Sequence, residues 1–140
     1  GLKMEHIKEF FKRDKFAEYC GIELVDVSPG RARAEMEVKE EHLNGVNTVH
    51  GGAIFTLADF AFAAAANSYG QVTVAINANI TYINALTRGK ITAEAREISR
   101  NPKLSTYTID ILNEEGEVAA VFQGLAYQKK MSLESLLEGE

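Results

Sequence analysis

The sequence has little of several residues that commonly carry chemistry or fix a fold. It contains one cysteine and two prolines, and it has no tryptophan. The single cysteine, Cys20, cannot form a disulfide within the chain. The three histidines are scattered, and no CxxC or HExxH motif occurs. The GxxxxGK[ST], GxGxxG and GxSxG motifs are also missing. We therefore expect no metal site, no nucleotide cofactor and no serine triad.

Positive charge is in short supply too. The formal net charge is −5 and the isoelectric point is about 5.3, which disfavours nucleic-acid binding. Residues 60–87 carry no charge, but Asn, Ser, Gln and Thr interrupt them, so we expect no membrane-spanning helix. Residues 1–16 are charged throughout and lack the apolar centre of a secretory signal. These features predict a cytoplasmic protein that binds neither nucleic acid nor membrane.

The length and apolar content predict one domain over residues 1–140. The chain is 46% hydrophobic, enough for a core of its own. Apolar side chains at helical spacing predict an N-terminal helix within residues 1–20, stopped by Gly21. Strand-like patterns, of which "RARAEMEV" alternates most regularly, follow over residues 22–28, 31–38, 73–82, 90–99, 103–112 and 117–128.

A second and longer helix is predicted over residues 51–69. This segment is rich in alanine, the best helix former, and it is apolar on nearly all sides. A helix of this kind must be enclosed, which favours an α+β fold with one antiparallel sheet curled around it. Six strands cannot surround a helix completely. We therefore expect a second copy of the chain to bury the remaining face.

One motif stands at the start of this helix: Asn44, then His50, Gly51 and Gly52, and then Asp59, the only acid in an apolar run. The spacing is Asn-x5-His-Gly-Gly-x6-Asp. With "GIELVDVSPGRARAEMEV" before it and "NITYINALTRG" after it, the chain resembles the hotdog-fold acyl-CoA thioesterases of the PaaI-like, phenylacetate-degradation branch. The resemblance covers roughly residues 10–130.

The resemblance implies a curved sheet of five to six strands around one long helix, in dimers that often pair into tetramers. It implies hydrolysis of an acyl-CoA substrate without a metal or an organic cofactor, the coenzyme A being part of the substrate. By position, Asp59 resembles the family's catalytic acid, and Gly51 and Gly52 resemble the backbone that polarises the thioester carbonyl. Asn44 and His50 match residues near that carbonyl and the leaving sulfur.

The chemistry of these residues is consistent with those roles. Backbone N–H groups at a helix N-terminus can stabilise an oxyanion, and glycine lets a substrate approach them. Apolar surroundings should raise the pKa of Asp59 and make it a better base, although it could instead attack the carbonyl directly. Simpler alternatives exist. Asp59 could be a hydrogen-bonded buried acid, His50 a helix-start residue, the glycines a packing device and Asn44 a turn residue.

The spacing of the motif predicts where the site lies. Gly51 and Asp59 are eight positions apart on one helix, which separates them by about 12 Å. One thioester carbonyl cannot lie about 3 Å from both. A site shared across a two-fold dimer, with the two helices antiparallel, solves this problem.

Related thioesterases often place a serine or threonine on the strand after the helix, where this chain has Ala75 and Asn77. Asn77 could replace that hydroxyl, or it could be a strand residue at a subunit contact. Arg88 and Lys103 are candidates for contacts to the phosphates of coenzyme A, with a solvated charged rim as the alternative. The missing hydroxyl motivates a second hypothesis, a non-catalytic acyl-CoA-binding or regulatory domain.

Overall fold

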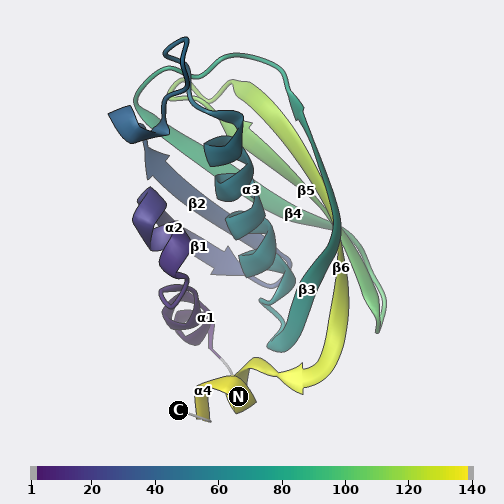
Figure 1. The fold of residues 1–140 in the computed structure, drawn as a ribbon. Helices are drawn as coiled ribbons and strands as arrows, with labels where there is room; N and C mark the ends of the chain where they lie inside the picture. Colours follow the sequence, from purple (N-terminus) through teal and green to yellow (C-terminus); the bar gives the residue numbers. More distant parts are fainter. Residues whose placement is uncertain (1–2, 139–140) are drawn as a thin grey trace.

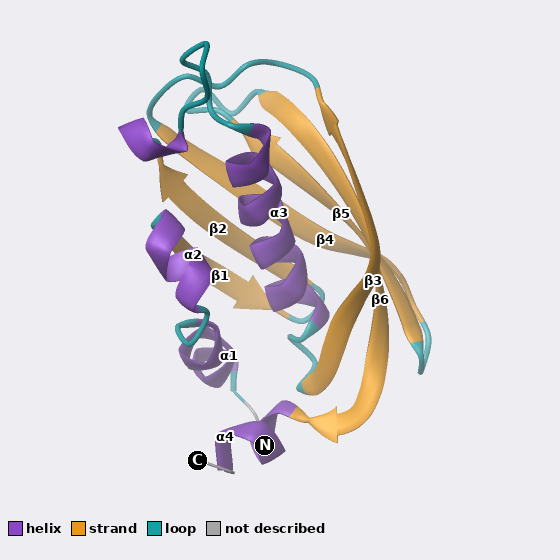
Figure 2. Cartoon of the chain, viewed as in Figure 1, coloured by secondary structure: helices purple, strands orange, loops and turns teal. Residues whose placement is uncertain are grey.

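A computed structural model describes residues 3–138 as one antiparallel sheet curved around one long helix (Figures 1 and 2). The helices are α1 (Met4–Phe11), α2 (Lys15–Cys20), α3 (Gly51–Ala66) and α4 (Leu133–Glu138), with a 3-10 turn at Glu40–His42. The strands are β1 (Ile22–Ser28), β2 (Arg31–Glu37), β3 (Gln71–Tyr82), β4 (Lys90–Arg100), β5 (Leu104–Leu112) and β6 (Val118–Ser132). The predicted α+β architecture is confirmed. None of the described helices is long and apolar enough to cross a membrane.

The strand order is β1-β2-β4-β5-β6-β3, so β1 and β3 form the two edges of the sheet. The β1 edge is protected. It has a bulge between Leu24 and Asp26, and the ammonium of Lys8 donates a 2.9 Å hydrogen bond to the carbonyl of Val25. The β3 edge is twelve residues long and carries no charge. A long uncharged edge presents unpaired backbone groups to which another strand can pair.

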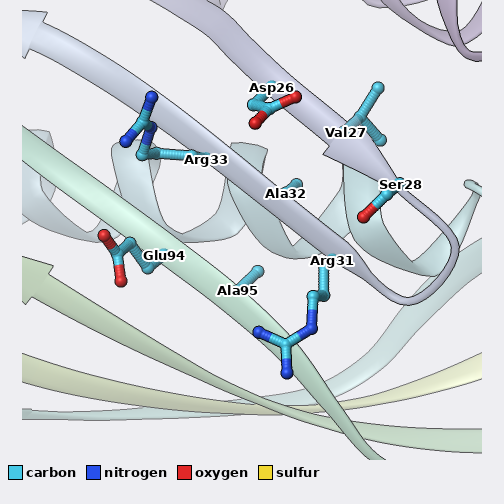
Figure 3. A pocket seen from close by; sticks show the side chains of 8 residues that line it. All are labelled: Asp26, Val27, Ser28, Arg31, Ala32, Arg33, Glu94 and Ala95. Carbon is cyan, nitrogen blue, oxygen red and sulfur yellow. The ribbon is translucent and has the colours of Figure 1, made fainter.

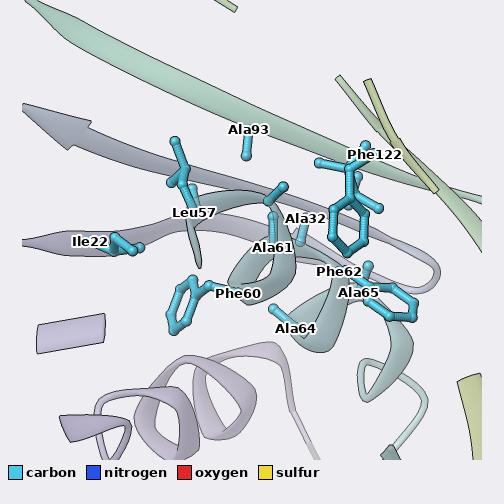
Figure 4. Close-up of a cluster of buried hydrophobic side chains, with 14 of the residues drawn as sticks. Ile22, Ala32, Leu57, Phe60, Ala61, Phe62, Ala64, Ala65, Ala93 and Phe122 are labelled. Carbon is cyan, nitrogen blue, oxygen red and sulfur yellow. The ribbon is translucent and has the colours of Figure 1, made fainter. Parts of the chain in front are cut away.

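The core lies between α3 and the concave face of the sheet (Figure 4). Small side chains such as Ala61 and Ala93 let the helix approach the strands closely, and both are fully buried. The aromatic rings fill the wider part, where Phe62 lies 5.7 Å from Phe122 between ring centroids. A Cβ on Gly124 would lie 2.6 Å from the Phe62 ring, so only glycine fits at that position of β6.

The N-terminal helical segment predicted within residues 1–20 is confirmed, but it forms two helices, α1 and α2, rather than one; residues 1–2 lie outside the described part. The chain breaks at Lys12–Asp14 because the Asp14 carboxylate accepts a 3.0 Å hydrogen bond from the N–H of Ala17 and begins a second helix. Phe11 then packs edge-on against Phe60 of α3, at 5.6 Å. The N-terminal helices therefore cover part of the α3 surface.

The central helix is shorter than predicted, ending at Ala66 rather than at residue 69. Asn67 stops it because its side-chain amide bonds in both directions. It donates to the carbonyl of Ala63 at 2.8 Å and accepts from the N–H of Thr73 at 2.8 Å. The chain then turns through Gly70, whose φ of 90° favours glycine, and enters β3.

Candidate active site

The N-terminus of α3 is capped by a histidine. His50 lies just outside the helix, and its Nδ1 accepts a 2.8 Å hydrogen bond from the N–H of Gly52. A Cβ on Gly52 would lie 2.9 Å from that nitrogen, so the cap requires glycine there. The N–H of Gly52 is therefore occupied within the chain. Of the two glycine donors predicted to polarise a carbonyl, only Gly51 keeps its N–H available.

Gly51 is the first residue of α3, and its N–H has no acceptor among the described residues. It lies at the positive end of the helix dipole, which favours a developing negative charge. A cavity of about 340 Å³ adjoins it. The cavity is lined by Thr48, Val49, Gly51, Ile54, Tyr82, Ile83, Asn84, Ala85 and Leu86. A cavity lined by both apolar and polar residues beside this N–H suits a compound with a carbonyl group and an apolar part.

Asp59 lies two turns further along α3 and is half-buried. Its carboxyl has no hydrogen bond or ion pair within residues 3–138, so the alternative of a buried acid held by a neighbouring group has no support. Burial raises the pKa of Asp59, and the negative charge of Asp14 raises it further. A carboxyl held in this way is a stronger base than a surface aspartate.

Asp59 belongs to a stripe of α3 that the rest of the chain leaves partly open. The stripe runs through Gly52, Thr56, Asp59 and Ala63, at the three- and four-residue spacing of one helix face. Because Gly51 and Asp59 lie on one continuous helix, the separation of about 12 Å holds for the folded chain. One chain therefore does not bring the two groups to a common carbonyl.

The part of the chain that contains this site matches a known protein family. Residues 46–120, more than half of the chain, match the thioesterase superfamily. The chain belongs to that superfamily. The match contains the helix-start glycines, all of α3, the three strands β3, β4 and β5, and the beginning of β6.

Two similar proteins and one solved structure show which thioesterases this chain resembles. Acyl-coenzyme A thioesterase PaaI of Escherichia coli is 33% identical, over 84% of this chain and 85% of the relative. Human acyl-coenzyme A thioesterase 13 is 34% identical, over 78% of this chain and 81% of the relative. The solved structure of E. coli PaaI superposes with a TM-score of 0.87 at 29% identity, covering 93% of this chain and 99% of that one. This thioesterase is therefore PaaI-like and has the hotdog fold.

Asn44 closes its own loop in this thioesterase. Its side-chain oxygen accepts from the N–H groups of Val46 and Thr48, at 3.0 and 3.1 Å, and its amide donates to the Thr48 hydroxyl at 2.8 Å. This is the turn role that was the simpler alternative. One amide hydrogen of Asn44 stays unused in these bonds.

Ala75 and Asn77 flank a bulge in β3, and the bulge sends their side chains to opposite faces of the sheet. Ala75 pairs with Ala126, which is buried on the side of α3, whereas Asn77 pairs with Leu125 on the other side. Asn77 therefore does not approach Asp59 of its own chain. The structure gives no support to its predicted role in substrate binding, and the alternative of a strand residue remains.

Arg88 and Lys103 do not form one phosphate site within a chain. Arg88 precedes β4 and Lys103 follows it, and the eleven residues of this strand span about 35 Å. Arg88 belongs to the β3–β4 connection, which also supplies the wall of the cavity beside Gly51. Lys103 lies in the turn at the far end of β4. If both bind coenzyme A, they do so in different regions of the molecule.

A second hollow, of about 180 Å³, lies on the face of the sheet away from α3 (Figure 3). Arg31 and Arg33 of β2 share it with Asp26 and Glu94 on the neighbouring strands. Two cations and two carboxylates offset one another, and none of the helix-start residues reaches this hollow. No group of three or more potential metal ligands occurs among residues 3–138.

Two residues near the site were not predicted from the sequence. His42 is buried; its Nδ1 accepts from the N–H of Lys39 at 2.9 Å, so its Nε2 donates to the carbonyl of Cys20 at 2.8 Å. The carbonyl of His42 also accepts from the N–H of His50 at 2.7 Å. Tyr82 bonds to the backbone of Gly51. No local sequence pattern predicts these contacts, because the hydrogen bonds join residues that are far apart in the sequence or use backbone atoms, which every residue has.

Proposed function

We propose that this protein hydrolyses an acyl-CoA thioester to the free acid and coenzyme A, in a site shared by two chains. The names of the two relatives, both acyl-coenzyme A thioesterases, support the substrate class. One observation carries the assignment of residues: two reactive groups on α3, the N–H of Gly51 and the carboxyl of Asp59, have no partner within the described chain.

In the proposed reaction the N–H of Gly51 donates to the thioester carbonyl oxygen and stabilises the oxyanion. Asp59 removes a proton from water, whose oxygen attacks the carbonyl carbon, and the tetrahedral intermediate expels the coenzyme A thiolate. In the alternative route the Asp59 carboxylate attacks the carbonyl carbon, the carbon–sulfur bond breaks and releases the coenzyme A thiolate, and water then hydrolyses the resulting anhydride. His50, through its Nε2–H, and Asn44, through the amide hydrogen that its loop bonds leave unused, are proposed to lie beside the carbonyl and the sulfur. Neither route uses a metal or an organic cofactor.

The open edge of the sheet supports the sharing of the site. Antiparallel pairing of β3 with β3 of a second copy generates a two-fold axis and lays the two α3 helices side by side. Gly51 of each chain then approaches Asp59 of the partner subunit, which gives two equivalent sites. The protected β1 edge offers no comparable surface.

A row of exposed apolar side chains supports the further pairing of dimers into tetramers. Val74, Tyr127 and Leu104 are cross-strand neighbours on the outer face of β3, β6 and β5. Contact between such patches would remove them from water. We also propose a cytoplasmic location, supported by the single unpaired thiol of Cys20.

One observation favours the alternative of an acyl-CoA-binding or regulatory domain without catalysis. Neither Ala75 nor Asn77 offers a hydroxyl on the α3 side of the sheet to orient water. Binding through the cavity and Gly51 does not need that hydroxyl. The two functions therefore differ in turnover and not in affinity.

The deciding experiment is thiol release from a panel of aryl-acetyl and medium-chain acyl-CoAs. We expect turnover by the wild-type protein and a loss of about 10²–10⁴-fold in kcat on replacing Asp59 with asparagine. Glu94→Gln is the matched control, because Glu94 lies on the outer face of the sheet. Binding without turnover by the wild type would select the regulatory alternative. Undiminished turnover by Asp59→Asn would remove Asp59 from the mechanism.

A further inference from the structure

The hydroxyl of Tyr82 makes a specific contact with the start of α3. Tyr82 is the last residue of β3, and its hydroxyl donates a 2.9 Å hydrogen bond to the carbonyl oxygen of Gly51. The ring also packs against Gly51, since a Cβ there would lie 3.1 Å from both Cζ and the hydroxyl oxygen of Tyr82. The contact joins residues 31 positions apart, from two different elements.

The other bonds around Gly51 complete a clamp on its backbone. The peptide between Gly51 and Gly52 is held at its carbonyl by Tyr82 and at its N–H by Nδ1 of His50. The preceding peptide is held through the carbonyl of His50, which accepts from the N–H groups of Ala53 and Ile54 at 2.9 and 3.2 Å. In these two peptides only the N–H of Gly51 has no acceptor among the described residues, and the four bonds constrain its direction.

The sequence makes such a clamp necessary. Two consecutive glycines have the widest conformational freedom of any dipeptide, and the first turn of a helix lacks intrahelical acceptors for its N–H groups. A hydrogen-bond donor lowers a reaction barrier most when it is already oriented before the charge develops. At this helix start, the side chains of His50 and Tyr82 supply two of the four bonds that hold the Gly51 backbone.

We propose that Tyr82 is a positioning residue that acts through Gly51 and orients its N–H toward the thioester carbonyl oxygen. The inference rests on the proposed role of Gly51 in acyl-CoA hydrolysis. Tyr82 does not touch the reacting atoms in this scheme, because its hydroxyl hydrogen is directed at the Gly51 carbonyl. Since Tyr82 ends β3, the strand proposed to pair with the second chain also holds the oxyanion donor.

The first test is Tyr82→Phe, which keeps the ring and removes one hydrogen bond. We expect kcat to fall about 3- to 10-fold, as for loss of one neutral hydrogen bond, with KM changed less than about twofold. Tyr19→Phe is the matched control and should match wild type, because the Tyr19 side chain is 84% exposed and its hydroxyl has no partner among the described residues. An unchanged kcat in Tyr82→Phe overturns the proposal.

A second readout separates positioning from a general effect on the fold. The infrared stretch of a carbon-13 ketone analogue of acyl-CoA, with a methylene in place of the sulfur, reports polarisation of the bound carbonyl. We expect a downward shift on binding to wild type and a smaller shift with Tyr82→Phe, at unchanged Tm and oligomeric state. If Tyr82→Phe is slower but shows the same infrared shift as wild type, or if its Tm is lower, then Tyr82 is a structural residue and the proposal is overturned. Absence of turnover and binding in the wild type would instead reject the proposed function.

Discussion

The shared site can be tested by combining two chains that are each inactive. The first carries Asp59→Asn and keeps the N–H of Gly51; the second carries Gly51→Pro and keeps Asp59. Proline suits position 51 for three structural reasons. It is the first helical residue, and its N–H has no acceptor in the described part of the chain. His50 before it has φ −58° and ψ 135°, the extended conformation that proline requires of its predecessor.

Each homodimer should be slow for its own reason. Loss of the Gly51 donor should lower kcat about 10²–10³-fold, and loss of the Asp59 base about 10²–10⁴-fold. A heterodimer purified on two different tags contains one site with both groups intact and one site with neither. It should therefore recover about half of the wild-type kcat per dimer, as the two-fold symmetry requires. Sites contained within single chains would give no recovery, and that result would refute the reasoning.

Gly51→Ala is the control for the proline. Both residues add a Cβ that meets Tyr82 at 3.1 Å, but alanine keeps the N–H. The half-exposed ring of Tyr82 can move by a few tenths of an ångström to admit it. We expect the alanine homodimer to stay far more active than the proline homodimer. Equal losses would assign the effect to crowding rather than to the missing donor.

Three further predictions concern pH and packing. If Asp59 is the base or nucleophile, kcat/KM should fall as pH drops through its pKa, at a midpoint above the usual aspartate value of about 3.9; a midpoint at or below that value would contradict this. At pH values above its raised pKa, the Asp59 carboxyl is charged and destabilises the folded chain. Asp59→Asn should therefore have a higher Tm than wild type at pH 7. The difference should vanish below about pH 3.9; a lower Tm at pH 7 would be the opposite of what burial requires. Gly124→Ala should lower the free energy of unfolding by about 1–3 kcal/mol in a denaturant titration, because Phe62 blocks the new Cβ, whereas Gly45→Ala, with no atom within 4 Å, should not.

The periodicity of the sequence was sufficient to predict most of the fold. The regular alternation of β2 and the alanine-rich run of α3 each follow from one repeated pattern, and both elements begin where they were predicted to begin. The errors fall where a single polar side chain overrides the pattern. Asp14 begins a new helix inside an amphipathic run, and Asn67 ends α3 three residues early by bonding to Thr73.

The candidate site was predictable in part. The spacing of Gly51 and Asp59 predicted their separation, because helix geometry alone determines it. Which glycine keeps a free N–H was not predictable, since the answer depends on the ring orientation of His50. The sequence also did not predict on which face of the sheet Asn77 lies. A bulge beside Ala75 changes the alternation of β3, and a sequence pattern does not reveal a bulge.

The open stripe of α3 relates the composition of the helix to the proposed chemistry. Apart from Asp59, the stripe residues Gly52, Thr56 and Ala63 have small side chains. Small residues at a contact allow two helices to approach to the lower end of the usual 8–10 Å between axes. In the proposed dimer, this spacing would let the backbone at Gly51 of one chain and the Asp59 carboxyl of the other reach one carbonyl between them. The same close packing would exclude water from the carboxyl and raise its pKa further. A large apolar residue in place of Ala63 would be accommodated on the open stripe of a single chain. In the proposed dimer, however, it would hold the second helix too far away for a shared site.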